Sequence, residues 1–280
     1  MIARPDIKAW SPPVQGITEV FHARFTDHVY PMHTHDSWTL LIVDEGMVKY
    51  DLDRHEHGAL AELVTLLPPH VPHNGCAVTP QGFRKRVLYL DSTQLSEDLV
   101  GLAVDSPVLD DHALRHQIHL LHSSLILPGE ELEAESRLAL VSERLQDHMQ
   151  KQVHSRSPLH DPGIARRLRD LLDEHYVDGI TLQQASNVLH AHPAHLVRAF
   201  SAEFGIGPHK YLTGRRVDLA RRLLLDGLPP RAVATAAGFY DQSHLTRHFK
   251  RILGTTPGHY ARTGSGARTG PVRESAEVGV

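Results

Sequence analysis

The chain has 280 residues, of which 41% are hydrophobic and 22% charged, as in an ordinary globular protein, and its length favours two domains. It lacks an apolar run of the ~18–20 residues that a membrane span needs, and its first residues, Met1 to Pro5, lack the apolar core of a secretory signal. The single cysteine, Cys76, excludes an intramolecular disulfide and a multi-cysteine zinc site. We therefore expect a cytoplasmic protein with no membrane partner.

The net charge of −4 hides an asymmetry along the chain. Residues 1–163 contain 13 Lys and Arg against 23 Asp and Glu, a net charge of −10, whereas residues 164–263 contain 14 against 8, a net charge of +6. A basic segment attached to an acidic one indicates that only the basic segment meets a polyanion such as nucleic acid.

The first hundred residues or so are predicted to form strands. Residues 39–43 are a β-rich run, a turn at residues 44–46 follows, and residues 47–52 alternate, which predicts a hairpin. Residues 63–67 and 87–90 are further strand candidates. Several short strands without long helices between them favour a small barrel or a sandwich.

Two amphipathic helices are predicted to follow the strands. The first carries an apolar stripe from Leu114 to Leu125, and the second spans residues 131–150. Two interpretations of these stripes stay open at this point. They pack on the barrel, or one of them faces a second copy of the chain.

Composition gives the domain boundaries. Residues 153–163 have no apolar periodicity and contain Pro158 and Pro162, which predicts a linker. Residues 264–280 are small, polar and glycine-rich, which predicts a disordered tail. The expected organisation is a sensor and dimerisation domain over residues 1–152, the linker, a helical domain over residues 164–263, and the tail.

The last third of the chain contains an internal repeat. Residues 195–200 (HLVRAF) align with residues 244–249 (HLTRHF), an offset of 49 residues. The same offset pairs Ala185 with Ala234, Gly205 with Gly254, Pro208 with Pro257, and Tyr211 with Tyr260. Matches of this number at one offset indicate a duplicated unit of roughly 50 residues.

The second copy is predicted to be a helix-turn-helix. Residues 230–237 form an alanine-rich helix opened by proline, Gly238 supplies the turn, and Asp241 caps a helix over residues 242–253 that Gly254 ends. Leu245, Phe249 and Ile252 are expected to face the core. The residues expected to face outward are Gln242, Ser243, Thr246, Arg247 and Lys250. Such a short polar and cationic face suits a reader of the DNA major groove, and the alternative is a solvated face.

The first copy has the same pattern. Thr181 caps a helix over residues 182–189, and a second helix begins at Pro193 and buries Leu196 and Phe200. Its outward positions are expected to be Ala194, Val197 and Arg198, with His195 at the flank. Residues 208–226 are predicted to form a helix of ~28 Å between the two copies. Two recognition helices held by it would lie about one DNA turn, ~34 Å, apart.

These residues resemble the AraC/XylS family of transcriptional regulators. The resemblance covers about residues 164–262 and is strongest over residues 238–250 and 254–260. In that family the outward positions of both recognition helices touch base edges, which implies this role for Ala194, Val197, Arg198, Gln242, Ser243, Thr246 and Arg247. His192 stands where the family has a serine cap, so the first unit is expected to read fewer bases.

The N-terminal half resembles the cupin-like sensor domain of the same family through residues 31–38 and 66–73. This resemblance implies an all-β, cupin-like barrel with appended helices, joined to an all-α domain of two helix-turn-helix units. The residues expected to bind a polar or aromatic small molecule are His33, His35, Trp38, His73 and Arg24. Cupin enzymes hold metals with such histidines and a glutamate, but Thr39 stands at the glutamate position, so no metal and no cofactor is expected.

The leading hypothesis is a sequence-specific transcription factor, and not an enzyme. Its expected partners are double-stranded DNA, a small-molecule effector, a second copy of the chain in a homodimer, and RNA polymerase. One alternative is a metal-dependent cupin enzyme fused to a DNA-binding module. Another is a module whose helices bind a different protein.

Overall fold

The computed structural model describes residues 6–26, 29–53, 55–59, 61–150 and 161–265. The chain divides into two compact units, each described here by itself. Unit 1 contains residues 1–160 and 181–199, and unit 2 contains residues 161–180 and 200–280. Most of the predicted linker and tail lies outside the described residues, although a helix already begins at Pro162.

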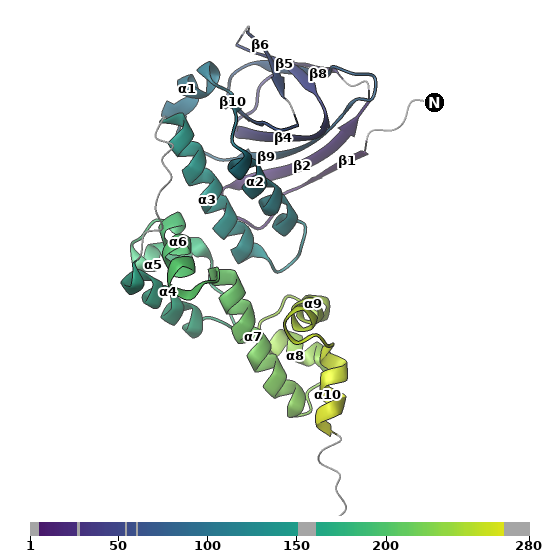
Figure 1. Cartoon of the computed structure of the whole chain (residues 1–280), viewed down its shortest axis with the longest axis vertical. Helices are drawn as coiled ribbons and strands as arrows, with labels where there is room; N and C mark the ends of the chain where they lie inside the picture. The colour runs from purple at the N-terminus through teal and green to yellow at the C-terminus, as the bar shows by residue number, and fades with distance from the viewer. Residues whose placement is uncertain (1–5, 27–28, 54, 60, 151–160, 266–280) are drawn as a thin grey trace, which may run out of the picture. The chain divides into compact units, whose positions relative to one another are not determined.

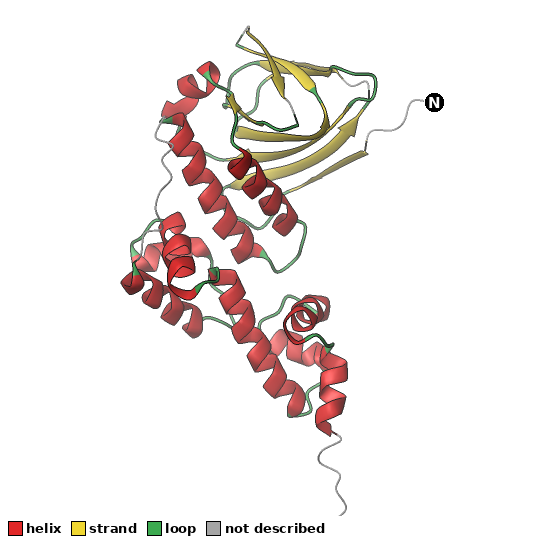
Figure 2. Ribbon diagram, in the orientation of Figure 1, coloured by secondary structure: helices red, strands yellow, loops and turns green. Residues whose placement is uncertain are grey.

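All strands found in the described residues belong to unit 1 (Figures 1 and 2). They are β1 (Asp6–Trp10), β2 (Ile17–Phe25), β3 (Val29–His33), β4 (Trp38–Gly46), β5 (Val48–Leu52), β6 (His55–Ala59), β7 (Val64–Leu67), β8 (His73–Ala77), β9 (Phe83–Leu90) and β10 (Val108–Leu109). One sheet has the order β1-β2-β9-β4-β7-β10 and the other β3-β8-β5-β6. The β-rich N-terminal fold predicted from the sequence is thereby confirmed.

Alternation along the strands gives the larger sheet two buried faces. Leu41 and Val43 of β4 pack with Tyr50 and Leu52 of β5 in a core between the two sheets. Their neighbours Trp38, Leu40 and Ile42 join a second core on the opposite face of the sheet. Because successive side chains of a strand point to opposite faces, a central strand covered on both sides reads as a continuous apolar run.

The hairpin predicted over residues 39–52 is wrong, although both of its strands exist. β4 pairs with β7 and β9, whereas β5 pairs with β6 and β8. The chain therefore crosses from one sheet to the other at Gly46–Met47. An irregularity in the pairing between Val43 and Glu45, and the bidentate hydrogen bond from Arg86 to Asp44, hold the end of β4 on β9 rather than on β5.

Helices cover the outer face of the larger sheet. After a short turn η1 (Glu97–Leu99) and α1 (Val100–Asp105) come α2 (His112–Leu125) and α3 (Glu131–Met149), close to the predicted bounds. The stripes of both helices, including Leu114, Ile118, Leu138 and Val141, are buried against Leu40 and other residues of the sheet. The stripes thus pack internally, and neither of them is available to a second copy of the chain.

A buried carboxylate ties α3 to the start of α2. Asp111 is 7% exposed and accepts a hydrogen bond from the backbone N–H of Leu114 at 2.9 Å, which caps α2. The same carboxylate pairs with Arg144 Nε and His148 Nε2 of α3, both at 2.5 Å. These donors, against the opposing effect of burial, hold the pKa of Asp111 well below its usual range.

The helices predicted for the last third are all present, as α5 (Leu182–Leu189), α6 (Pro193–Phe204), α7 (Pro208–Leu225), α8 (Pro230–Ala236) and α9 (Gln242–Leu253). Two helices that were not predicted flank them, α4 (Pro162–Glu174) and α10 (Pro257–Ser265). Thr181 and Gln184 form a capping box on α5, and the Asp241 carboxylate accepts the His244 N–H at 2.6 Å to cap α9. Leu245 and Phe249 are buried as predicted, but Ile252 is 48% exposed, because α9 is in its last turn there. Within the described residues no helix is both long and apolar enough to cross a bilayer.

The turn of the second helix-turn-helix requires glycine at Gly238. Its φ is +76°, and a Cβ there would lie 2.3 Å from the carbonyl oxygen of Val177. Gly254, which ends α9, has a similar φ of +72° but open space around it. Both positions need a residue that tolerates a positive φ, but only Gly238 also needs the absence of a Cβ.

We expect Gly238→Ala to lower the free energy of unfolding much more than Gly254→Ala. The second change carries only the left-handed strain, about 1–2 kcal/mol. The first adds a clash with backbone and should cost about 3 kcal/mol or more. Urea denaturation followed by circular dichroism measures both, and equal losses would contradict the close approach of the turn to residue 177.

Candidate DNA-reading helices and barrel site

The exposed face of α9 carries the side chains that the sequence assigned to DNA. Gln242, Ser243 and Lys250 are exposed, and Thr246 and Arg247 are partly exposed. The opposite face is buried through Leu245 and Phe249 in a core formed with α7 and α8. A helix anchored on one side, with amide, hydroxyl and cationic groups on the other, has the donors that base edges and phosphates accept.

The corresponding face of α6 differs, and the expectation for two of its residues is corrected. Ala194 is 0% exposed and Val197 is 6% exposed, so neither points into solvent. Their equivalents in the repeat, Ser243 and Thr246, are exposed and partly exposed. The equivalent positions of the two copies therefore differ in exposure.

Two contacts join α3 to the first helix-turn-helix unit. Arg198, one helical turn from Ala194, forms an ion pair with Glu143 of α3. Glu135 of α3 accepts a hydrogen bond from the backbone N–H of Leu182 at the start of α5. His195 is half-buried, and the N–H of Ala194 donates to His192 Nδ1 at 3.3 Å, so His192 does cap the helix.

Three of the five predicted ligand residues come together at one end of the barrel. His33 and His73 are direct cross-strand partners on β3 and β8, and their ring centroids lie 4.6 Å apart. His35 lies 4.9 Å from His33 and 5.1 Å from His73 by the same measure. We call these three residues the barrel histidines.

The hydrogen bonds of the barrel histidines determine which nitrogen is available. Nδ1 of His33 lies 2.7 Å from the carbonyl oxygen of Pro31, and Nδ1 of His73 lies 3.0 Å from that of Val71. A carbonyl only accepts, so in both rings Nδ1 carries the hydrogen and Nε2 keeps its lone pair. Burial, with the neighbouring histidines and Lys85, lowers the pKa of His35 to about 4, and burial also lowers the pKa of His73. His35 and His73 are thus neutral at pH 7.

Lys85 and Tyr89 also belong to this site, and the sequence analysis did not identify them. The Lys85 ammonium lies 4.2 Å from the ring centroid of Tyr30 and 5.7 Å from that of Phe21, and burial lowers its pKa to about 8. The Tyr89 ring lies 5.0 Å from that of His35. Side chains alternate between the two faces of a strand, so Lys85 and Tyr89 share the inner face of β9 with Val87, and this spacing was the signal available in the sequence.

Two predicted ligand residues are not part of this site. Trp38 is 1% exposed, lies in the core under α2 and α3, and donates its indole N–H to the carbonyl oxygen of Leu95 at 2.9 Å. Arg24 follows Ala23, which faces the barrel core, so its own side chain points outward, where it lies 3.6 Å from Glu45. Each residue is on the wrong face of its strand to meet the barrel histidines.

The ring nitrogens of the barrel histidines could also bind a metal ion. One nitrogen from each can be chosen so that all three lie within 4.8 Å of one another. The Nδ1 hydrogen bonds of His33 and His73 to backbone carbonyls are those that orient histidine ligands in metal sites. Three imidazole ligands suit zinc, nickel, copper or ferrous iron.

Two protein families match the two halves of the chain. Residues 16–146 match the family described as AraC-like ligand binding domain, and residues 185–263 match the family described as helix-turn-helix domain. The chain is 28% identical over 229 residues to the uncharacterized HTH-type transcriptional regulator YbfI of Bacillus subtilis, covering 77% of this chain and 81% of that protein. It is 27% identical over 145 residues to the probable transcriptional regulator LumQ of Photobacterium leiognathi, covering 50% of this chain and 58% of that protein.

Among solved structures, the AraC-like transcriptional activator CuxR is similar with a TM-score of 0.43 and 15% identity, covering 77% of this chain and 80% of that one. The two family matches are in the order expected for a sensor domain followed by a DNA-binding domain. The chain belongs to the AraC family of transcriptional regulators, with an N-terminal ligand-binding domain and a C-terminal helix-turn-helix domain that binds DNA.

Proposed function

We propose that α9 is the main reader of DNA sequence in this regulator, and that α6 contributes when its outward face is free. The exposed polar face of α9, anchored by its buried opposite side, is the observation that carries this proposal. Arg247 carries the guanidinium fork that can make a bidentate contact to guanine, while Gln242, Ser243 and Thr246 offer hydrogen bonds to other bases. Lys250, one turn further along, suits a phosphate.

The barrel supplies the response to an effector in this proposal. The barrel histidines and Lys85 offer imidazole nitrogens and one ammonium, which suit a small molecule with a carboxylate or another acceptor. We propose that the barrel binds this molecule without transforming it. In the same proposal the chain acts in the cytoplasm as a homodimer that forms through residues 1–152 and binds DNA through residues 164–263, and the DNA-bound dimer contacts RNA polymerase.

We expect Arg247→Ala to weaken binding to the mapped operator by about 1–3 kcal/mol and to relax the sequence preference at one position. Genome-wide mapping of the occupied DNA identifies the operator, and mobility shift with single-base variants of it measures both effects. Retention of both affinity and preference would exclude α9 as the reader.

Lys250→Ala is the matched comparison on the same helix. A phosphate contact carries no sequence information, so we expect weaker binding to all sequences and a salt dependence of log K that falls by about one unit of slope. The stoichiometry of the complex, two chains per operator, tests the proposed homodimer. Transcription from that operator with purified RNA polymerase tests the contact with the polymerase.

A second candidate function, metal binding, is favoured by the geometry of the barrel histidines. In this case the ion would be held by Nε2 of His33 and His73 together with His35, and it would supply an open coordination position for a ligand. Thr39 lies at the position of the usual glutamate and is buried in β4. The donor set would therefore be three nitrogens.

We expect the protein, after incubation with Zn²⁺ or Ni²⁺ and desalting, to retain one equivalent if this candidate is correct. His73→Ala should lower the affinity more than about tenfold, because it removes one of three ligands. His55→Ala is the control, since His55 is an exposed histidine of β6 outside the cluster. Elemental analysis that finds no metal, or equal retention by both variants, rules this candidate out.

A further inference from the structure

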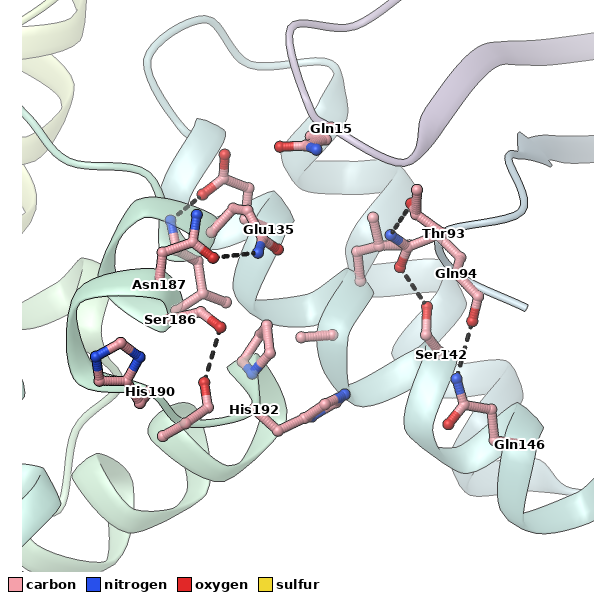
Figure 3. Close-up of a pocket in the computed structure, with 16 residues that line it drawn as sticks. Gln15, Thr93, Gln94, Glu135, Ser142, Gln146, Ser186, Asn187, His190 and His192 are labelled. Carbon is pink, nitrogen blue, oxygen red and sulfur yellow. Dashed lines mark hydrogen bonds between the residues drawn. The ribbon is translucent and has the colours of Figure 1, made fainter. Parts of the chain in front are cut away.

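A polar cavity of about 670 Å³ lies in unit 1, away from the barrel histidines (Figure 3). One wall is α3, through Glu135, Leu138 and Ser142. The opposite wall is α5 and the turn that leads to Pro193, the first residue of α6. The segment with Thr93 and Gln94 closes a third side. The cavity thus joins the outer helices of the sensor to the first helix-turn-helix unit.

Half of the sixteen residues that line this cavity carry an amide or a hydroxyl in their side chains. The amides come from Gln15, Gln94, Gln146, Gln183 and Asn187. Several of them already bond to one another, as Ser142 does to Gln94 at 2.8 Å and Gln183 to Asn187 at 3.0 Å, which fixes their orientation. Groups that both donate and accept suit a ligand with hydroxyl or amide functions.

The lining contains one acidic side chain, that of Glu135, and no lysine or arginine. The Glu135 side chain is 9% exposed, and one of its oxygens accepts the Leu182 N–H at 2.5 Å. Burial, followed by the charge of Glu131, raises the pKa of Glu135 to about 7. A buried carboxylate without a cation at its side is costly, and a cationic ligand would offset that cost.

We propose that this cavity binds a small primary amine that also bears hydroxyl groups, with Glu135 as the counterion of the ammonium. The lining hydroxyls and amides bind the polar groups of the ligand. An anion finds no positive lysine or arginine there, and a neutral polyol leaves Glu135 without a counterion. A primary ammonium has three donors, one for the free oxygen of Glu135 and two for neighbouring carbonyl or hydroxyl oxygens.

Occupancy of the cavity has a consequence for DNA, which rests on the role proposed above for α6. In the arrangement that forms the cavity, Ala194 and Val197 are covered and Arg198 pairs with Glu143. A ligand held between α3 and α5 stabilises this arrangement over any in which α6 is free. Because linkage is reciprocal, the amine lowers the affinity for DNA and DNA lowers the affinity for the amine.

The test uses three probes of one shape: 4-amino-1-butanol, 1,4-butanediol and 4-hydroxybutanoate. Each has four carbons and a hydroxyl, and at pH 8 they carry charges of +1, 0 and −1. Isothermal titration of the full chain without DNA should give a dissociation constant about tenfold lower for the amine than for the diol, the difference expected for one charge-assisted hydrogen bond. The anion should bind more weakly than either. Equal affinity for all three, or tightest binding of the diol, overturns the proposal.

Glu135→Gln removes the charge and keeps an oxygen for the Leu182 N–H, so the variant should fold. It should bring the amine and the diol to similar affinities. Glu97→Gln removes the same charge from an exposed residue of η1 that does not line the cavity, and it should leave the tenfold ratio unchanged. A ratio that survives in Glu135→Gln, or that is lost in Glu97→Gln, overturns the assignment to this cavity.

A mobility shift with the mapped operator then tests the coupling. The amine should weaken DNA binding of the natural chain and leave that of Glu135→Gln unchanged. An unchanged DNA affinity of the natural chain with the cavity saturated overturns the coupling. Failure to bind DNA with or without the amine contradicts the proposed function instead, and the titration without DNA still decides whether the cavity takes an amine.

Discussion

The carboxylate of Asp111 fixes α3, and with it the placement of Glu135 and Glu143. It caps α2 through Leu114 and holds α3 through Arg144 and His148, so both helices are locked in one register on the sheet. Glu143 directly precedes Arg144 in α3, and Glu135 lies nine residues before Arg144 on the same helix. The direction in which they point follows from it. A carboxylate buried with three donors is expensive to separate from any one of them, which makes the register of α3 stringent.

Duplication made the DNA-binding half the easiest part to predict from the sequence. Caps at Thr181 and Asp241, and glycines at 238 and 254, are local signals that act within a few residues, and the structure has all of them. The hairpin at residues 39–52 failed for the opposite reason. A turn sequence shows that the chain reverses, but whether β4 pairs with β5 or with β9 depends on residues such as Arg86, which is 42 residues from its partner Asp44.

The residues of the barrel site could be predicted from the sequence where the alternation of inward and outward side chains along each strand was taken into account. The barrel histidines were found because they carry the resemblance, whereas Lys85 and Tyr89 carry no motif and are visible only through their spacing with Val87. Trp38 and Arg24 were chosen for side-chain type and proved to be on the wrong faces. The burial of Ala194 and Val197 had no signal in their own helix, and the ion pair of the neighbouring Arg198 is made with Glu143, 55 residues earlier. Such contacts between distant segments are beyond any reading of local pattern.

The unequal exposure of the two copies of the repeat bears on how the chain would first meet a duplex. With α9 open and the equivalent face of α6 closed, an encounter would engage a single groove, and electrostatic attraction from the basic segment would hold it there loosely. A longer footprint would need the other copy to be uncovered first. Searching along DNA and binding a full site would then be two distinct events, separated by the breaking of the ion pair between Arg198 and Glu143.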